Sequence, residues 1–156
     1  MSLKHELKAE QVAHLDLTEF CQVVSGTAVR DALTQMRRQK VNVCLVTVGN
    51  DLKGVFTDRD VMVRVATHSE TLDQPIDEVM TADPITIRPT MSAAEALWLM
   101  DDKGFRNLPV VGDDGRLLGS MTHQAVINYL AARYPVEVLN RPPRPDQVSR
   151  KQEGGD

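Results

Sequence analysis

The predicted fold is organised around one stretch of seven residues, Gly54-Val55-Phe56-Thr57-Asp58-Arg59-Asp60. Apolar runs lead into it, and apolar residues at helical spacing follow it over 61–66, so we predict a strand that turns into a helix at Thr57. Thr57 can cap this helix, and Asp60 can accept the N–H of Thr57 in return. A helix start also attracts anions, so the stretch is interpreted either as a plain cap or as a phosphate site.

The residues before this stretch predict the other elements of one structural unit. Residues 23–24 are predicted as a short strand, and 28–40 as a helix with Val29, Ala32, Leu33 and Met36 on one face. Residues 42–48 form a continuous apolar run, which indicates a strand buried on both sides. A hairpin turn at 49–51 then leads into a strand over 53–57 and a helix over 58–67.

The same pattern begins again after a polar linker. Ala32, Leu33 and Met36 recur 64 residues later as Ala96, Leu97 and Met100, and Gly54 and Thr57 recur 65 residues later as Gly119 and Thr122. Strands are predicted at 85–87, 107–111 and 117–122. Helices are predicted from a capping box at Ser92 and Glu95, and over 123–134.

This internal repeat sets the domain organisation. We expect an α+β fold of two βαββα units, residues 15–72 and 73–134, packed about a pseudo-twofold axis, because one such unit buries its apolar faces poorly alone. Residues 1–14 are predicted as a polar N-terminal segment. Residues 135–156 are predicted as an extended arm that contains proline and arginine. A solvated tail is favoured for this arm over a contact with a partner or a nucleic acid.

Composition excludes several classes of protein. A net charge of −4 argues against nucleic-acid binding by the whole surface. Two cysteines and four scattered histidines predict no disulfide framework and no metal site. The chain shows no signal peptide and no membrane span, so a cytoplasmic protein is expected. No set of catalytic residues and no Walker-type glycine loop is recognised, so we expect no enzyme.

Three sequence features together resemble the CBS domain, and their repetition resembles the tandem pair called a Bateman module. They are GVFTDRD at 54–60, the linker VMTADPITI at 79–87 and FRNLPVVGDDGRLLG at 105–119. The resemblance runs from about residue 15 to 134. It implies a stand-alone regulatory protein with two clefts between the repeats, and a homodimer. The implied ligand is AMP, ADP, ATP or S-adenosylmethionine, with no further cofactor required.

The resemblance also implies which residues bind this ligand in the first cleft. The threonine of the motif would contact phosphate and its aspartate would hold the ribose hydroxyls, which are Thr57 and Asp60 here. Arg59 and Arg106 would lie near phosphate, although Arg106 could equally be a surface charge. The remaining residues of the cleft would be Val55, Pro84, Ile85, Phe105 and Asn107.

The second cleft departs from this pattern. Thr122 is kept, but Ala125 stands where the first repeat has Asp60, and no arginine matches Arg106. The loss of a charge-assisted hydrogen bond weakens binding, so we predict one competent cleft and one weak or empty cleft. The other residues of this second cleft would be Phe20, Cys21, Val41, Asn42 and Val43.

Two functions of different class follow. The favoured one is a sensor that binds an adenosine-containing ligand at Thr57 and Asp60 and is read by a separate effector protein. The alternative is a ligand-independent dimerisation module with vestigial clefts, in which Thr57 and Asp60 form only a cap. Arg59 favours the sensor, because a helix cap does not require an arginine at that position.

Overall fold

The computed structural model describes residues 3–133, and it divides the chain into two compact units, Met1–Val126 and Ile127–Asp156. Both copies of the repeated glycine–threonine motif, at 54–60 and 119–125, lie in the first unit. In the second unit the described residues continue one helix, α5, which spans His123–Arg133. The predicted arm at 135–156 lies outside the described residues.

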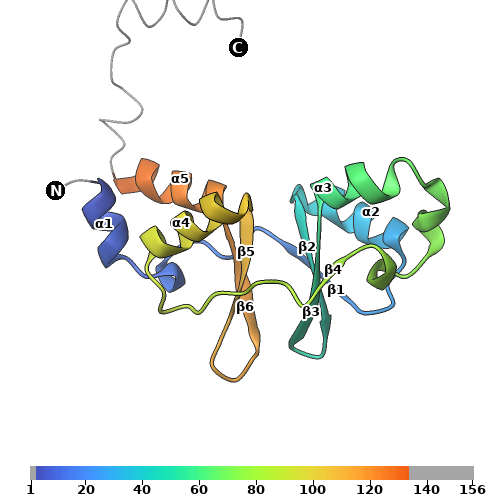
Figure 1. Ribbon diagram of the computed structural model, residues 1–156, viewed down its shortest axis with the longest axis horizontal. Coiled ribbons are helices and arrows are strands. Elements are labelled where there is room, and N and C mark those ends of the chain that lie inside the picture. The colour runs from blue at the N-terminus through green and yellow to red at the C-terminus, as the bar shows by residue number, and fades with distance from the viewer. Residues whose placement is uncertain (1–2, 134–156) are drawn as a thin grey trace, which may run out of the picture. The chain divides into compact units, whose positions relative to one another are not determined.

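The first repeat is built on a four-stranded sheet in the order β1-β2-β3-β4 (Figure 1). Strand β2 is parallel to β1 and antiparallel to β3, and five of its six residues are buried, as the continuous apolar run predicted. Helix α2 packs against the core through its buried residues Val29, Ala32 and Met36. The elements are β1 (Cys21–Val24), α2 (Val29–Gln39), β2 (Val43–Val48), β3 (Asp51–Thr57), α3 (Asp58–Asp60), η2 (Val61–Val65) and η3 (Ser69–Asp73).

The second repeat has a two-stranded sheet, β5-β6. The N–H of Glu95 donates to the hydroxyl of Ser92 at 3.1 Å, which forms the predicted cap. The helix ends at Gly104, whose φ of +71° is left-handed and favours glycine. The elements are η4 (Ile76–Glu78), β4 (Thr81–Ala82), α4 (Ala93–Lys103), β5 (Asn107–Val111), β6 (Leu117–Thr122) and α5.

The predicted strand at 85–87 is wrong, because only one isolated parallel bridge, between Ile87 and Val110, forms there. Ile87 accepts the N–H of Val111 at 3.0 Å and donates its own N–H to Pro109 at 3.0 Å. The next bond of a parallel ladder would need an N–H from Pro109, which a proline lacks. The corresponding residue of the first repeat is Leu45, and there β1 pairs with β2 over its full length.

The segment that precedes each repeat in the sequence packs against the other repeat in the structure. Val12 donates its N–H to the carbonyl of Met91 at 2.9 Å, and the equivalent bond joins Ile76 to Thr27 at 2.7 Å. Each segment therefore runs beside the helix start of the other repeat, as the pseudo-twofold relationship requires. The N-terminal elements are α1 (Leu3–Ala9) and η1 (Val12–His14).

The N-terminal segment, which was predicted as polar, contributes a buried apolar side chain to the core. Val12 is fully buried, as is its equivalent Ile76, which belongs to the core of the first repeat. Residues 10–13 thus contribute to the second repeat, and α1 packs beside α4 (Figure 1).

Cys21 and Cys44 are opposite each other on β1 and β2, and both are buried. The Cys44 thiol donates a hydrogen bond to Cys21, and this bond together with burial raises the pKa of Cys44. A thiol held neutral in this way is a poor nucleophile, as expected for small core residues.

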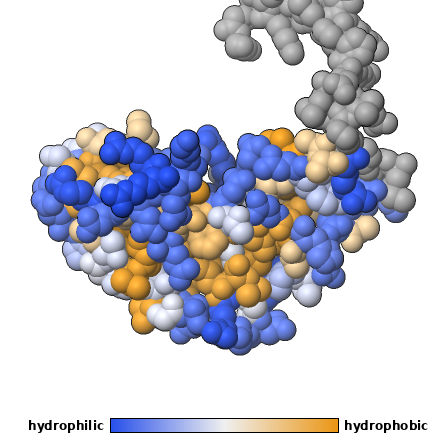
Figure 2. All heavy atoms as spheres, turned by 180° about the vertical axis from the view of Figure 1, so that it is seen from behind, coloured by the Kyte–Doolittle hydropathy of each residue, from blue (hydrophilic) through white to orange (hydrophobic). Residues whose placement is uncertain are grey.

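The surface of the described residues carries several large exposed hydrophobic side chains. Figure 2 shows apolar side chains gathered in the middle of one face, with hydrophilic ones around them. Trp98 on α4 is 68% exposed.

Candidate functional site

A cavity of about 910 Å³ lies between the two repeats, within the first unit of the chain. Its walls come from β3 and the turn after it, from the linker after β4, and from the segment between α4 and β5. All nine residues predicted for the first cleft line it: Val55, Thr57, Arg59, Asp60, Pro84, Ile85, Phe105, Arg106 and Asn107.

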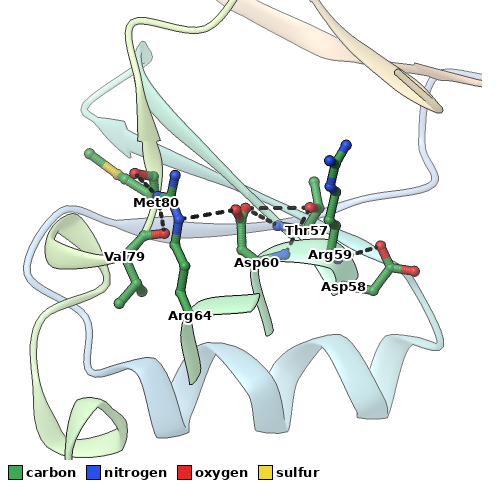
Figure 3. Close-up of polar contacts among 7 residues, drawn as sticks. All are labelled: Thr57, Asp58, Arg59, Asp60, Arg64, Val79 and Met80. Carbon is green, nitrogen blue, oxygen red and sulfur yellow. Dashed lines mark hydrogen bonds and ion pairs between the residues drawn. The ribbon is translucent and has the colours of Figure 1, made fainter. Parts of the chain in front are cut away.

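Thr57 and Asp60 form a complete capping box (Figure 3). The Oδ2 atom of Asp60 accepts the backbone N–H of Thr57 at 2.9 Å and its hydroxyl at 3.3 Å. The N–H of Asp60 donates to the Thr57 hydroxyl at 3.4 Å. These bonds fix the direction in which the Asp60 carboxylate faces the cavity.

The helix after this cap differs from the one predicted over 58–67. Only Asp58–Asp60 is α-helical, and Val61–Val65 continues as a π-helix in which Ala66 donates to Val61 at 2.8 Å. The helical segment after the cap therefore spans 58–65 and changes from α- to π-helical bonding within it. Arginine side chains and the Thr57 hydroxyl at this helix start can also attract an anion.

Two arginine side chains provide positive charge at the cavity. Among residues 3–133, neither Arg59 nor Arg106 has a side-chain hydrogen bond or ion pair assigned to it, and both are exposed. The side chain of Arg59 extends away from the Asp58 and Asp60 carboxylates (Figure 3). The backbone of Arg106 is fixed, because its carbonyl accepts the N–H of His123 at 3.2 Å.

The sequence did not identify several further lining residues. Arg64 could have been found from its position four residues after Asp60, since such residues are neighbours on a helix. Asp83 carries no comparable signal, and its left-handed φ of +49° is visible only in the structure. The additional residues are Asp58, Met62, Val63, Arg64, Thr81, Asp83, Gly104, Leu108 and Pro109.

The second predicted cleft has a different character. Thr122 caps α5 by accepting the N–H of Ala125 at 3.0 Å, so the cap is kept without a carboxylate. Cys21 and Val43 are at most 2% exposed, whereas Ile85, the first-cleft counterpart of Cys21, is 42% exposed. Of the remaining residues predicted here, Phe20 and Val41 are half-buried and Asn42 is exposed.

The described part of the chain shows neither a metal-binding cluster nor a membrane-spanning helix. Within residues 3–133, no three His, Cys, Asp or Glu side chains are grouped so that they could hold a metal ion. None of the helices in that range is long and apolar enough to cross a membrane.

The model of the CBS domain matches the chain twice, over residues 16–67 and 76–132. The chain belongs to the CBS domain family. Both the family prediction and the predicted α+β fold of paired repeats are confirmed.

Relatives of this CBS pair include an uncharacterised protein, MK0525, from Methanopyrus kandleri. It is 32% identical over 124 residues, which cover 74% of this chain. The chain spans 63% of the length of that relative.

Two solved structures similar to this CBS pair contain adenine nucleotides. CBSX2 in complex with AMP is 28% identical with a TM-score of 0.70, and the match covers 80% of this chain and 98% of that one. The cytosolic domain of the Mg²⁺ channel MgtE in complex with ATP is 26% identical with a TM-score of 0.65. That match covers 81% of this chain and 51% of the MgtE chain.

Proposed function

We propose that this CBS pair is a non-enzymatic regulatory module that binds an adenosine-containing nucleotide in the cleft at Thr57 and Asp60. The observation that carries the proposal is the single cavity lined by all nine residues predicted for the ligand. The AMP and ATP complexes of CBSX2 and MgtE support it.

Each part of such a ligand has a chemical counterpart in the cavity. A ribose diol offers two hydroxyl donors to the Asp60 carboxylate, which is half-buried and held in place by Thr57. A flat base suits the apolar wall of Val55, Pro84 and Ile85. Phosphate suits the Thr57 hydroxyl and the guanidinium groups of Arg59 and Arg106, which have no assigned partner among residues 3–133.

The same charges favour AMP, ADP or ATP over S-adenosylmethionine. Arg59 and Arg106 lack an anionic partner among the described side chains, and a phosphate group supplies one. A sulfonium ligand adds positive charge to this region. We therefore expect the phosphorylated ligands to bind more tightly.

Isothermal titration of the chain with AMP, ADP, ATP and S-adenosylmethionine tests the proposal. Asp60→Asn keeps an acceptor for the cap but removes the carboxylate charge. The affinity for the best ligand should then fall by about tenfold to a hundredfold, since a charge-assisted hydrogen bond contributes about 1.5–3 kcal/mol. Asp73→Asn is the matched control, because Asp73 pairs with Arg30 on the surface and lies outside the cavity.

The stoichiometry of this titration tests the predicted asymmetry of the two clefts. One nucleotide should bind per chain at low concentration, because the second cleft has Ala125 in place of the aspartate. Two sites of equal affinity would contradict this part of the proposal. If wild-type protein binds none of the four ligands, the nucleotide proposal fails and the ligand-independent assembly module is favoured.

A further inference from the structure

Arg64 contacts both sides of the candidate nucleotide site. It lies on the π-helix η2, and its Nη1 atom donates to the carbonyls of Val79 at 2.9 Å and Met80 at 3.2 Å. Its Nε atom lies 3.9 Å from Oδ1 of Asp60, close enough for an ion pair but too long for a direct hydrogen bond (Figure 3).

Val79 and Met80 begin the linker that forms the opposite wall of the cavity. The next residues, Thr81–Ala82, form β4 and pair with Val55 and Gly54 on β3. Asp83, Pro84 and Ile85 follow and line the cavity. A displacement of the linker at Met80 would therefore move the wall that faces Asp60.

The side chain of Met80 fills the space next to Gly54. A Cβ atom built on Gly54 would overlap the Met80 sulfur, so β3 and this side chain are in close contact. The NMR signal of the Met80 methyl group should therefore be sensitive to the packing of the linker against the strand that leads to Thr57.

The two carboxylate oxygens of Asp60 have different partners. Oδ2 is taken by Thr57, and Oδ1 faces Arg64. The Asp60 side chain is 13% exposed, so this charge attraction is screened less than that of a surface pair. In the second repeat the positions of Asp60 and Arg64 are occupied by Ala125 and Tyr129, so both members of the pair are replaced.

We propose that Arg64 is a positioning residue that couples the Asp60 carboxylate to the linker at Val79–Met80. Its guanidinium holds the Asp60 carboxylate in the orientation that accepts ribose hydroxyls. A displacement of this carboxylate therefore moves Arg64 and, through the hydrogen bonds of Arg64, the linker. The ligand-dependent part of this inference rests on the proposed nucleotide site, whereas the coupling itself is a property of the protein without ligand.

The coupling is tested first without any ligand, by NMR of the full chain labelled with ¹³C at the methionine methyl groups. A Met80→Leu variant assigns the Met80 signal. Asp60→Asn should shift this signal in wild-type protein and leave it unchanged in an Arg64→Gln background, because Arg64 carries the effect. A shift of equal size in both backgrounds would overturn the inference.

The second test measures nucleotide affinity by isothermal titration with AMP. Arg64→Gln should weaken binding by roughly fivefold or more, and it should add no further loss in an Asp60→Asn background. Arg64→Lys should bind AMP nearly as weakly as Arg64→Gln, because an ammonium group lacks the planar fork that reaches the two carbonyls and Asp60 together. Arg30→Gln is the matched control, since Arg30 pairs with Asp73 on the surface.

The two tests separate the inference from the proposed function. If wild-type protein binds no nucleotide but the methionine shift depends on Arg64, the proposed function fails and the coupling stands. If nucleotide binds but Arg64→Gln leaves affinity unchanged, Arg64 does not position Asp60. If Arg64→Gln only lowers the melting temperature and the effects on affinity are additive, its role is structural and the inference is overturned.

Discussion

The backbone N–H of Val12 donates to the carbonyl of Met91 at 2.9 Å, which fixes the N-terminal segment to the second repeat. Val12 is fully buried there. A segment that precedes the first repeat in sequence is therefore part of the core of the second. This relationship leads to the first prediction.

Val12→Ala should destabilise the chain by about 2 kcal/mol, because it removes two buried methyl groups and leaves a cavity. Urea unfolding followed by circular dichroism measures the change in the free energy of unfolding. Val24→Ala is the matched control, since Val24 is 62% exposed and should lose less than about 0.5 kcal/mol. Equal effects of the two substitutions would show that the N-terminal segment adds nothing to the core.

The equivalent glycines Gly54 and Gly119 should respond unequally to alanine. A Cβ on Gly119 would lie 2.6 Å from the backbone oxygen of Leu17, whereas a Cβ on Gly54 meets only the side chain of Met80. A side chain can rotate away more easily than a bonded backbone can move, and Leu17 accepts the N–H of Ser120 at 2.9 Å. Gly119→Ala should therefore lower the melting temperature more than Gly54→Ala does.

A second substitution distinguishes this steric explanation from a loss of backbone freedom. Met80→Ala creates space beside Gly54, so it should reduce the cost of Gly54→Ala. Thermal unfolding of the single and double variants provides the comparison. Costs that simply add would contradict the steric account.

Asp77 should make stability depend on pH in the acidic range. The Ser25 hydroxyl and the Gly26 N–H, at 2.7 Å from Oδ1, donate to its carboxylate and lower its pKa below 3.8. A lowered pKa in the folded state contributes stability above the unfolded pKa, and this contribution is lost as pH falls through the folded pKa. Because solvent screens this carboxylate, Asp77→Asn should cost less than about 1 kcal/mol near neutral pH and progressively less in acid.

Chemical denaturation of wild-type and Asp77→Asn protein between neutral pH and the acid range measures this difference. Ser25→Ala removes a donor to the same carboxylate, so it should add little in the Asp77→Asn background. A stability difference that is constant with pH would contradict the assignment to Asp77.

We predict that Trp98 lies in the interface of the homodimer that is expected from the sequence. It is 68% exposed on α4, and large exposed aromatic side chains are enriched at protein interfaces. Trp98→Lys should shift the mass measured by light scattering from dimer to monomer. Val24→Lys, at a similarly exposed position on β1, should leave the mass unchanged.

Much of the fold follows from the sequence because periodic patterns repeat at a fixed spacing. The continuous apolar run over 42–48 and the cap at Thr57 each determine an element locally, and both are present. The strand at 85–87 failed because its partner contains Pro109, a feature of a residue distant in sequence. The exchange of Val12 and Ile76 between repeats also depends on contacts that no local pattern encodes.

The nine cavity residues that were predicted were identified through the resemblance to the family motif. Thr57 and Asp60 carry their own physical signal, because a threonine and a carboxylate three residues apart form a capping box. The spacing of four residues indicates that Arg64 lies near Asp60, but its hydrogen bonds to carbonyls of the linker depend on contacts that sequence spacing does not define.

The exchanged segments make each half of this chain incomplete without the other. A cut between residues 68 and 74 would yield two fragments, and each would carry a buried segment that belongs to its counterpart, namely the residues around Val12 and around Ile76. The two halves therefore resemble the subunits of an obligate heterodimer joined by a tether. Neither fragment should fold well alone, and co-expression should yield a paired complex.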